Sequence, residues 1–196
     1  MKNGKNRICP VQNAKHLDNR IRRWFQNPKK ILGSYLKEGM TVLDIGCGPG
    51  FFSIEIAEML GPSGKVIATD LQAGMLDKLK GKIRGTAIEK RIRLHQSGQS
   101  AVNVSETVDF ALAFYMVHEV PEQSRFFSEI RSMLNGNGSL FVVEPNFHVS
   151  KKAFKKTVEK AVSAGFSVAE TPRVFFSKAV LLKPDKYTIA IPRNLE

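Results

Sequence analysis

The sequence predicts an α/β fold with a doubly wound, mostly parallel sheet, and three observations lead to this class. Short apolar runs alternate along the chain with segments whose apolar residues recur at helical spacing. A glycine-rich turn joins the first apolar run directly to the helical segment behind it. The last two runs, near 167–175 and 178–183, have no helical segment between them, which indicates an antiparallel hairpin at one edge of the sheet.

Each element follows from its local sequence. Asn27-Pro28 is typical of a helix entry, and Gly39 is typical of the end of that segment. Residues 97–106 are polar and irregular, so we expect a loop there. The expected helices are 28–37, 52–60, 73–84, a helix opened by Pro121 that runs to Leu134, and 150–164. The expected strands are 41–45, 65–70, 91–95, 108–114, 139–143 and the two closing runs.

Length and composition describe an ordinary globular protein. The chain has 196 residues, of which 42% are hydrophobic and 24% charged, so it can bury a core of one domain. No apolar run approaches the roughly 20 residues of a membrane helix, and the basic start has no apolar stretch behind it. Two cysteines, Cys9 and Cys47, are too few for a disulfide framework or an all-cysteine zinc site. We therefore expect a cytoplasmic protein without a bound metal.

The positive charge is unevenly distributed. Thirty Lys and Arg residues face 18 Asp and Glu, a formal net charge of +12, and residues 1–30 contain a single acid, Asp18. A second basic cluster lies at 151–160, within an expected helix. Such runs are compatible with solvated faces and with a surface for RNA or an acidic metabolite. We divide the chain into a basic N-terminal arm or lid (1–27), the α/β domain (28–185) and a C-terminal tail (186–196).

The glycine-rich turn predicts a nucleoside-binding site. In doubly wound sheets, ligands bind at the carboxyl ends of the strands, and Asp70 ends the second strand 20 residues after Gly50. A carboxylate there can accept hydrogen bonds from ribose hydroxyls. The dinucleotide fingerprint does not fit, since Phe51 stands where it requires glycine and Pro49 lacks an N–H. Asp44 is also a poor neighbour for a phosphate, so a nicotinamide cofactor is disfavoured.

The segment 42–50, VLDIGCGPG, resembles the first motif of class I S-adenosylmethionine-dependent methyltransferases. The similarity covers about 28–183: Asp70 matches the ribose-binding acid, 108–118 the fourth strand and its loop, 134–140 the turn before the fifth strand, and 164–166 the turn before the sixth. The chain is most similar to the small-molecule subgroup that includes ubiquinone/menaquinone C-methyltransferases. The resemblance implies a Rossmann-like sheet of seven strands, S-adenosylmethionine as cofactor and a small-molecule acceptor.

The resemblance also assigns cofactor-binding residues by position. The turn is expected to hold the methionine part of the cofactor, Asp70 the ribose, and Leu71 and Met75 the two sides of the adenine. Gln99 stands where many members have an aspartate that accepts from the adenine amino group, and it is a neutral substitute. The full expected set is Asp44, Gly46, Cys47, Gly48, Gly50, Asp70, Leu71, Met75, Gln99 and Phe114.

Three candidate catalytic residues follow the fourth strand: Tyr115, His118 and Glu119. Methyl transfer is an in-line displacement that depends on alignment, and an oxygen or carbon nucleophile usually needs a general base. His118 is equally compatible with a helix cap or a core-edge position, and Glu119 with a helix start.

Two further segments flank the expected site. Residues 144–148 end the fifth strand, and His148 there is a candidate for the substrate pocket. In the basic arm, Trp24 and Phe25 are candidates for a lid or for simple aromatic packing on the domain. Two other functions stay open, namely an RNA methyltransferase that uses the basic arm and a non-catalytic cofactor-binding module.

Overall fold

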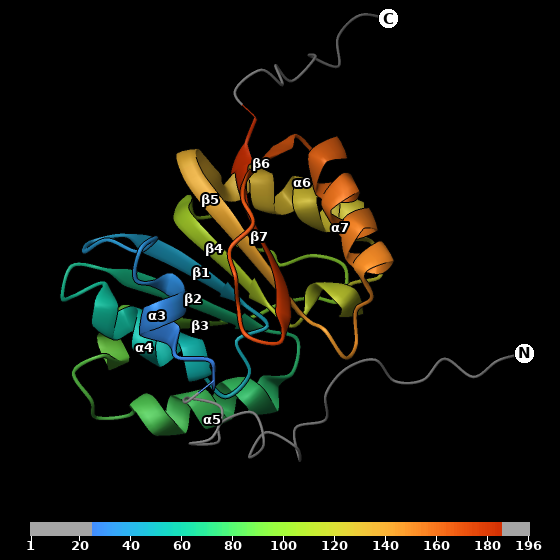
Figure 1. Ribbon diagram of the computed structural model, residues 1–196. Helices are drawn as coiled ribbons and strands as arrows, with labels where there is room; N and C mark the ends of the chain where they lie inside the picture. Colours follow the sequence, from blue (N-terminus) through green and yellow to red (C-terminus); the bar gives the residue numbers. More distant parts are fainter. Residues whose placement is uncertain (1–24, 186–196) are drawn as a thin grey trace, which may run out of the picture.

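The computed structural model describes residues 25–185, which form one seven-stranded sheet in the order β3-β2-β1-β4-β5-β7-β6 (Figure 1). The first five strands are parallel, and β7 pairs antiparallel with both β5 and β6. This confirms the doubly wound sheet with an antiparallel edge hairpin. The strands are β1 (Thr41–Ile45), β2 (Lys65–Asp70), β3 (Ile92–Gln96), β4 (Val108–Phe114), β5 (Leu134–Pro145), β6 (Phe166–Glu170) and β7 (Ser177–Pro184).

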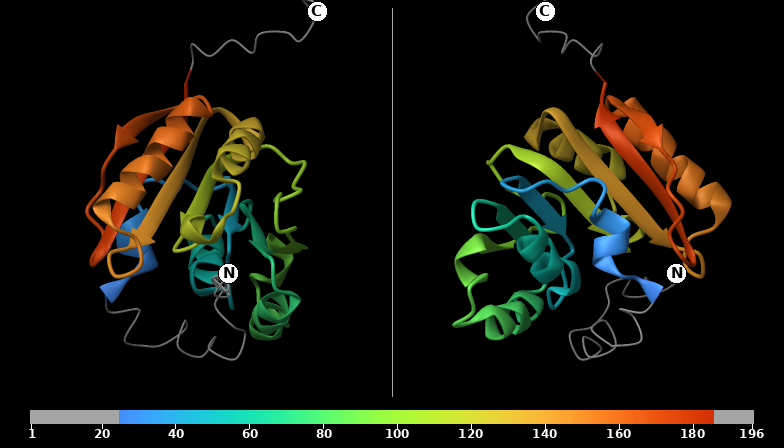
Figure 2. Two further views of the ribbon diagram at one scale, coloured as in Figure 1. Left: turned by 90° about the vertical axis from the view of Figure 1, so that its right-hand side faces the viewer. Right: turned by 60° about the vertical axis from the view of Figure 1, so that its left-hand side comes forward.

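Helices cover both faces of the sheet (Figure 2). One core cluster joins the sheet to α3, α4 and α5, and a second joins it to α6, α7 and the loop after β3. The helices are α3 (Pro28–Leu32), α4 (Phe51–Met59), α5 (Ala73–Ile83), α6 (Gln123–Met133) and α7 (Lys151–Ser163), with short 3-10 helices η2 (Glu89–Arg91) and η3 (Val117–Glu119). None of the helices within 25–185 is both long and apolar enough to cross a bilayer.

The two cores exist because neighbouring residues of a strand face opposite sides of the sheet. In β4, Phe110 and Leu112 belong to the α4 side and Ala111 to the α6 side. All three are buried, as expected for a central strand covered on both faces. The strand order reverses between β1 and β4, so the loops after these strands diverge and leave a crevice at their carboxyl ends.

Two expected boundaries are wrong. The first helix ends at Leu32 rather than near 37. Gly33 N–H makes the last helical bond, to Lys29 O, and Tyr35 and Leu36 then both donate to Leu32 O in a turn. The stretch Asn135–Gly138 is not a turn outside the sheet, since β5 already begins at Leu134. Asn135 donates its side-chain amide to Asp109 of β4, which holds these polar residues beside that strand.

The other expected elements are confirmed with ends shifted by a few residues. The helix expected from Pro121 begins at Gln123, after η3. Strand β6 is shorter than expected, because it ends at Glu170. Strand β7 is slightly longer than expected and begins at Ser177. Most of the basic arm, including Trp24, and the tail 186–196 lie outside the described residues.

Candidate functional site

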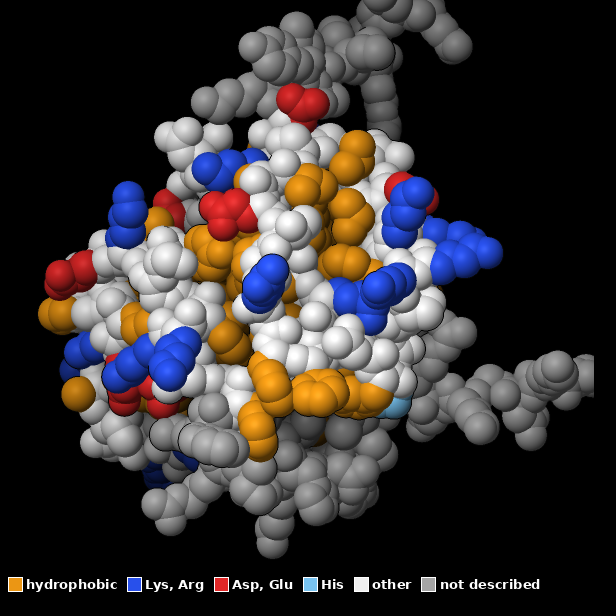
Figure 3. Space-filling model, viewed as in Figure 1, with side chains coloured by type: hydrophobic (Ala, Val, Ile, Leu, Met, Phe, Trp, Pro, Cys, Tyr) orange, Lys and Arg blue, Asp and Glu red, His pale blue; other side chains and the backbone are white. Residues whose placement is uncertain are grey.

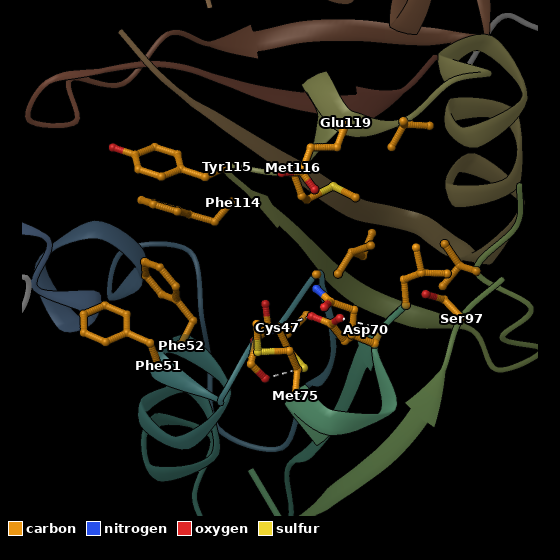
Figure 4. A pocket seen from close by; sticks show the side chains of 18 of the residues that line it. Cys47, Phe51, Phe52, Asp70, Met75, Ser97, Phe114, Tyr115, Met116 and Glu119 are labelled. Carbon is orange, nitrogen blue, oxygen red and sulfur yellow. Dashed lines mark hydrogen bonds between the residues drawn. The ribbon is translucent and has the colours of Figure 1, made fainter. Parts of the chain in front are cut away.

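A cavity of about 710 Å³ opens at the carboxyl ends of β1, β2 and β4 (Figure 4). Asp70, Cys47 and Met75 lie on one side of it, and Met116 and Glu119 lie on the opposite side. An aromatic group occupies one end, formed by Phe51, Phe52, Phe114 and Tyr115. The cavity therefore has a polar wall from the glycine turn and an aromatic wall from α4 and β4.

The glycine turn is held in place by Asp70. Gly46, Gly48 and Gly50 all have positive φ, at 69°, 54° and 87°, a conformation that glycine adopts without steric cost. One carboxyl oxygen of Asp70 accepts from Gly48 N at 2.9 Å, and the other accepts from Gln72 N at 2.9 Å. Burial raises the pKa of Asp70. The Leu71 backbone also hydrogen-bonds this carboxyl group, whose two oxygens have acceptor capacity for about four hydrogen bonds, so capacity remains for a ligand.

Asp44 lies beneath the turn and is 2% exposed. Its Oδ2 accepts from the Ser53 hydroxyl of α4 at 2.5 Å, which ties the end of β1 to the helix behind the turn. Cys47 is also buried, and burial beside Asp44 and Asp70 raises the pKa of its thiol well above the usual value. The thiol is therefore protonated and acts as a small apolar wall residue.

Gly50 serves the fold and is not among the residues that line the cavity. It caps α4 with φ of 87°, and a Cβ added to it would lie 2.3 Å from Leu79 Cδ1. A glycine is required at position 50 because Leu79 of helix α5 packs directly against the turn. By contrast, a Cβ at Gly48 would meet no atom within 4 Å, so its backbone faces open space in the cavity.

Tyr115 begins the loop after β4 in a strained conformation, with φ of 62°. Its ring packs on Phe114 with centroids 4.4 Å apart. Its hydroxyl accepts from Gln26 Nε2 at 2.6 Å and lies 2.6 Å from Ser177 Oγ. Ser177 Oγ in turn donates to Phe175 O, so the Tyr115 hydroxyl is the donor toward Ser177. This chain of hydrogen bonds joins three distant segments around the aromatic end of the cavity.

Glu119 is the acidic candidate after β4, and it lines the cavity. Burial raises its pKa to about 7; His118 lowers it, and the negative charges of Asp70 and Glu144 raise it further. A carboxyl group with a pKa near 7 exchanges protons readily at neutral pH, which is the property of a general base.

His118 does not line this cavity. Its Nδ1 lies 2.6 Å from Glu144 Oε2, its backbone N–H donates to Glu144 Oε1 at 2.9 Å, and its ring stacks on His148 with centroids 5.9 Å apart. Glu144 is 1% exposed. His148, which was expected in the substrate pocket, does not line the cavity either. The contacts of the two histidines instead join η3 to the end of β5.

The structure brings together most of the sequence-predicted site residues. Every predicted cofactor-binding residue except Gly50 lines the cavity, Gln99 included, as do Tyr115 and Glu119. Phe25, Met116 and Phe147, which lie in segments that the sequence analysis placed at the site, also line the cavity, whereas Phe175 and Phe176 were missed. Phe147, Phe175 and Phe176 line the cavity and are exposed, and Phe25 stacks on Phe175 with centroids 5.0 Å apart. The adjacent pair at 175–176, apolar and next to a strand start, was the available signal.

Comparisons with known proteins agree with this geometry. A family model described as a methyltransferase domain matches residues 36–180. A demethylmenaquinone methyltransferase of Lactobacillus johnsonii is 32% identical over 110 residues, which cover 56% of this chain and 45% of that protein. An arsenite methyltransferase of Halobacterium salinarum is 30% identical over 117 residues, 59% of this chain and 29% of that protein.

Among solved structures, a SAM-dependent methyltransferase from Aquifex aeolicus superposes with a TM-score of 0.81 at 26% identity, covering 89% of this chain and 98% of that one. The chain spans about half the length of the demethylmenaquinone methyltransferases that it matches. The family model alone covers well over half of the chain. On these grounds the chain belongs to the methyltransferase-domain family and shares its fold with S-adenosylmethionine-dependent methyltransferases.

Proposed function

We propose that this protein transfers a methyl group from S-adenosylmethionine to a small, apolar, aromatic acceptor. The observation that carries the proposal is the division of one cavity into a polar wall and an aromatic wall. The polar wall suits an amino-acid and ribose ligand, and the aromatic wall suits a flat ring.

The residues of the polar wall fit the cofactor. Gly48 faces open space, and the Asp70 carboxyl has acceptor capacity left for ribose hydroxyls. Leu71 and Met75 supply apolar surface for a base, and Gln99 supplies an amide. The buried carboxyl of Asp44 adds negative charge beneath a ligand that carries an amino group and a sulfonium.

The chemistry needs alignment and a proton acceptor. When bound, S-adenosylmethionine would supply a methyl carbon open to in-line attack by a nucleophilic carbon or oxygen of the acceptor, with the carbon–sulfur bond breaking and its electron pair leaving on sulfur as a neutral thioether. Phe114 and Tyr115 position the acceptor ring, and Glu119 takes the proton that the acceptor loses, since its pKa of about 7 leaves it partly ionised at neutral pH.

The acceptor class rests on the aromatic residues at the mouth. Phe147, Phe175 and Phe176 are 73%, 51% and 67% exposed, an unusual concentration of apolar surface around a cavity. Two of the relatives are named demethylmenaquinone methyltransferases, and an aromatic quinol is the kind of ring that this mouth would admit.

The test uses cofactor that carries a labelled methyl group. The full chain is incubated with reduced demethylmenaquinone in one reaction and with a fractionated lysate in another, and Glu119→Gln serves as the impaired variant. Label in the quinol or in another low-mass apolar product supports the proposal, and loss of that label in Glu119→Gln supports the assigned base. Binding of the cofactor with no transfer to any fraction would instead identify a non-catalytic cofactor-binding module.

RNA remains the competing acceptor. The basic face of α7 favours it, and a short stretch is 57% identical over 37 residues to a ribosomal RNA large subunit methyltransferase E, covering 19% of this chain. In the same experiment, label confined to RNA, with transfer that falls steeply as salt rises, would replace the small-molecule acceptor by RNA.

A further inference from the structure

A second cavity, of about 380 Å³, lies between the first turns of α7 and the loop that joins β6 to β7. No acidic residue of 25–185 lines it. Four basic residues do, together with two hydroxyl residues and an apolar remainder. The lining residues are Lys151, Phe154, Lys155, Thr171, Pro172, Arg173, Val174, Ser177, Lys178 and Ala179.

One of the four basic side chains is fixed in place. Lys178 Nζ donates to Asn146 Oδ1 at 2.7 Å and to Val149 O at 2.7 Å, both neutral acceptors. An ammonium group has three donors, so one N–H of this held side chain is left for a ligand. Arg173 and Lys151 are exposed and enter no ion pair with another residue of 25–185.

Helix α7 places its charges against the local electrostatic preference. Acidic side chains are favoured in the first turn of a helix, because the N-terminal backbone carries partial positive charge. The first turn of α7 contains no acid and begins with Lys151 and Lys152. The other α-helices of residues 25–185 also lack an acid in the first turn, so this feature alone marks no site. A bound anion would interact favourably with both lysines and with the N-terminal backbone of α7.

We propose that this second cavity binds the phosphate or pyrophosphate group of a small organic molecule. Four cationic side chains match a multiply charged anion better than a single carboxylate. Thr171 and Ser177 add hydroxyl donors, and the apolar surface of Phe154 and Val174 suits an organic body attached to the anion. The volume lies at the lower end of the range for small-molecule sites.

The β6–β7 loop lies between the two cavities and contributes residues to both. Phe175 and Phe176 of the β6–β7 loop line the larger cavity, whereas Arg173 and Val174 of the same loop line the smaller one. Ser177 lines the smaller cavity and holds the hydroxyl of Tyr115 in the larger one. Figure 3 shows basic side chains over α7 and the strands beside it, adjacent to a row of exposed hydrophobic side chains. An anion in the smaller cavity therefore contacts the loop that bounds the acceptor mouth.

The test is a calorimetric titration of the full chain with inorganic pyrophosphate, and then with inorganic phosphate and with phenyl phosphate. We expect one saturable site per chain. Replacing the two α7 lysines that line the cavity, as Lys151→Gln/Lys155→Gln, weakens binding by about tenfold or more. The matched control Lys152→Gln/Lys156→Gln removes the same charge from the same helix outside the cavity, and it changes the affinity by less than about twofold.

Arg173→Ala is the second variant, and its expected loss matches that of the cavity double variant. Phenyl phosphate is expected to bind more tightly than inorganic phosphate, because its ring can contact Phe154.

Equal weakening by both double variants, or the lack of a saturable site, overturns the proposal. Tight binding of an RNA oligonucleotide that both double variants weaken equally would also overturn it and would assign this face to RNA. Binding is measured without the cofactor or an acceptor, so the result is independent of the proposed methyl transfer.

Discussion

Glu144 holds His118 at two points, since it accepts the backbone N–H at 2.9 Å and lies 2.6 Å from ring Nδ1. The glutamate is buried at the end of β5, and His118 belongs to η3, which also carries Glu119 into the cavity. The pair therefore joins two loops of the site, and its role is to position η3.

Glu144→Gln tests this role. The glutamine amide has one acceptor oxygen, so it can accept from only one of the two His118 groups that Glu144 contacts, and its NH₂ faces the other group. We therefore expect the free energy of unfolding to fall by about 1–3 kcal/mol. Urea unfolding measures the change. His148→Ala removes an exposed ring that contacts His118 and Phe147, and it should cost less than about 0.5 kcal/mol. Equal stability of Glu144→Gln and the parent protein would show that the pair does not hold η3.

Two glycines of the α4–α5 region give opposite expectations. Gly50→Ala forces a Cβ to 2.3 Å from Leu79 at a φ of 87°, and it should destabilise the fold by about 2 kcal/mol or more. Gly81 lies within α5 and a Cβ there meets nothing within 4 Å, so Gly81→Ala should stabilise by about 0.5–1 kcal/mol. Urea unfolding of both variants checks the pair. A neutral Gly50→Ala would mean that α5 does not pack on the turn.

The sequence was sufficient to predict the sheet and the polar wall of the site. A glycine turn after a strand and an acid at the end of the next strand are local signals, and parallel strands bring both to the same edge. The aromatic mouth depends on contacts between distant segments, such as Phe25 with Phe175 and Gln26 with Tyr115. No pattern along the chain encodes such pairings, so only the folded structure shows them.

His118 illustrates a different limit. Its neighbours Val117 and Glu119 differ in environment, because in a 3-10 helix successive side chains point about a third of a turn apart. Val117 is buried in the core, Glu119 lines the cavity, and His118 lies against Glu144. The sequence identified His118 and Glu119 together as candidates. The structure distinguishes them because their side chains point in different directions from η3.

Asp70→Asn tests the cofactor site. The asparagine retains the size of the side chain but loses the charge and one acceptor, so the affinity for S-adenosylmethionine should fall by about tenfold or more. Calorimetric titration measures the affinity at a temperature well below unfolding. Asp77→Asn, an exposed position on α5, is the matched control and should change the affinity less than about twofold. Unchanged affinity in Asp70→Asn would remove this residue from the cofactor site.

The raised pKa of Glu119 makes the stability of the fold depend on pH. Its folded pKa of about 7 lies above the ordinary value of 4.5, so the folded protein retains a proton that the unfolded chain loses. Stability from this group is present below pH 4.5 and declines as the pH rises to about 7. Because the side chain is partly exposed, we expect Glu119→Gln to be more stable than the parent by only about 1–2 kcal/mol at pH 8. Urea unfolding at pH 4.5 and pH 8 tests this, and a difference that is the same at both pH values would contradict the raised pKa.

Tyr115→Phe separates a catalytic from a positioning role at the aromatic end of the cavity. The ring contact with Phe114 remains, whereas Gln26 and Ser177 lose the hydroxyl that joins them. We expect a stability loss of about 0.5–1.5 kcal/mol, the usual contribution of a hydrogen bond. If the hydroxyl only positions the mouth, Gln26→Ala and Ser177→Ala will reproduce the change in kcat and KM for the acceptor. If the hydroxyl contacts the reacting atoms, Tyr115→Phe alone will lower kcat, by about a hundredfold or more. The Tyr115 hydroxyl already accepts from Gln26 and donates to Ser177, so we expect that it only positions the mouth. All three variants should then raise KM for the acceptor more than they lower kcat.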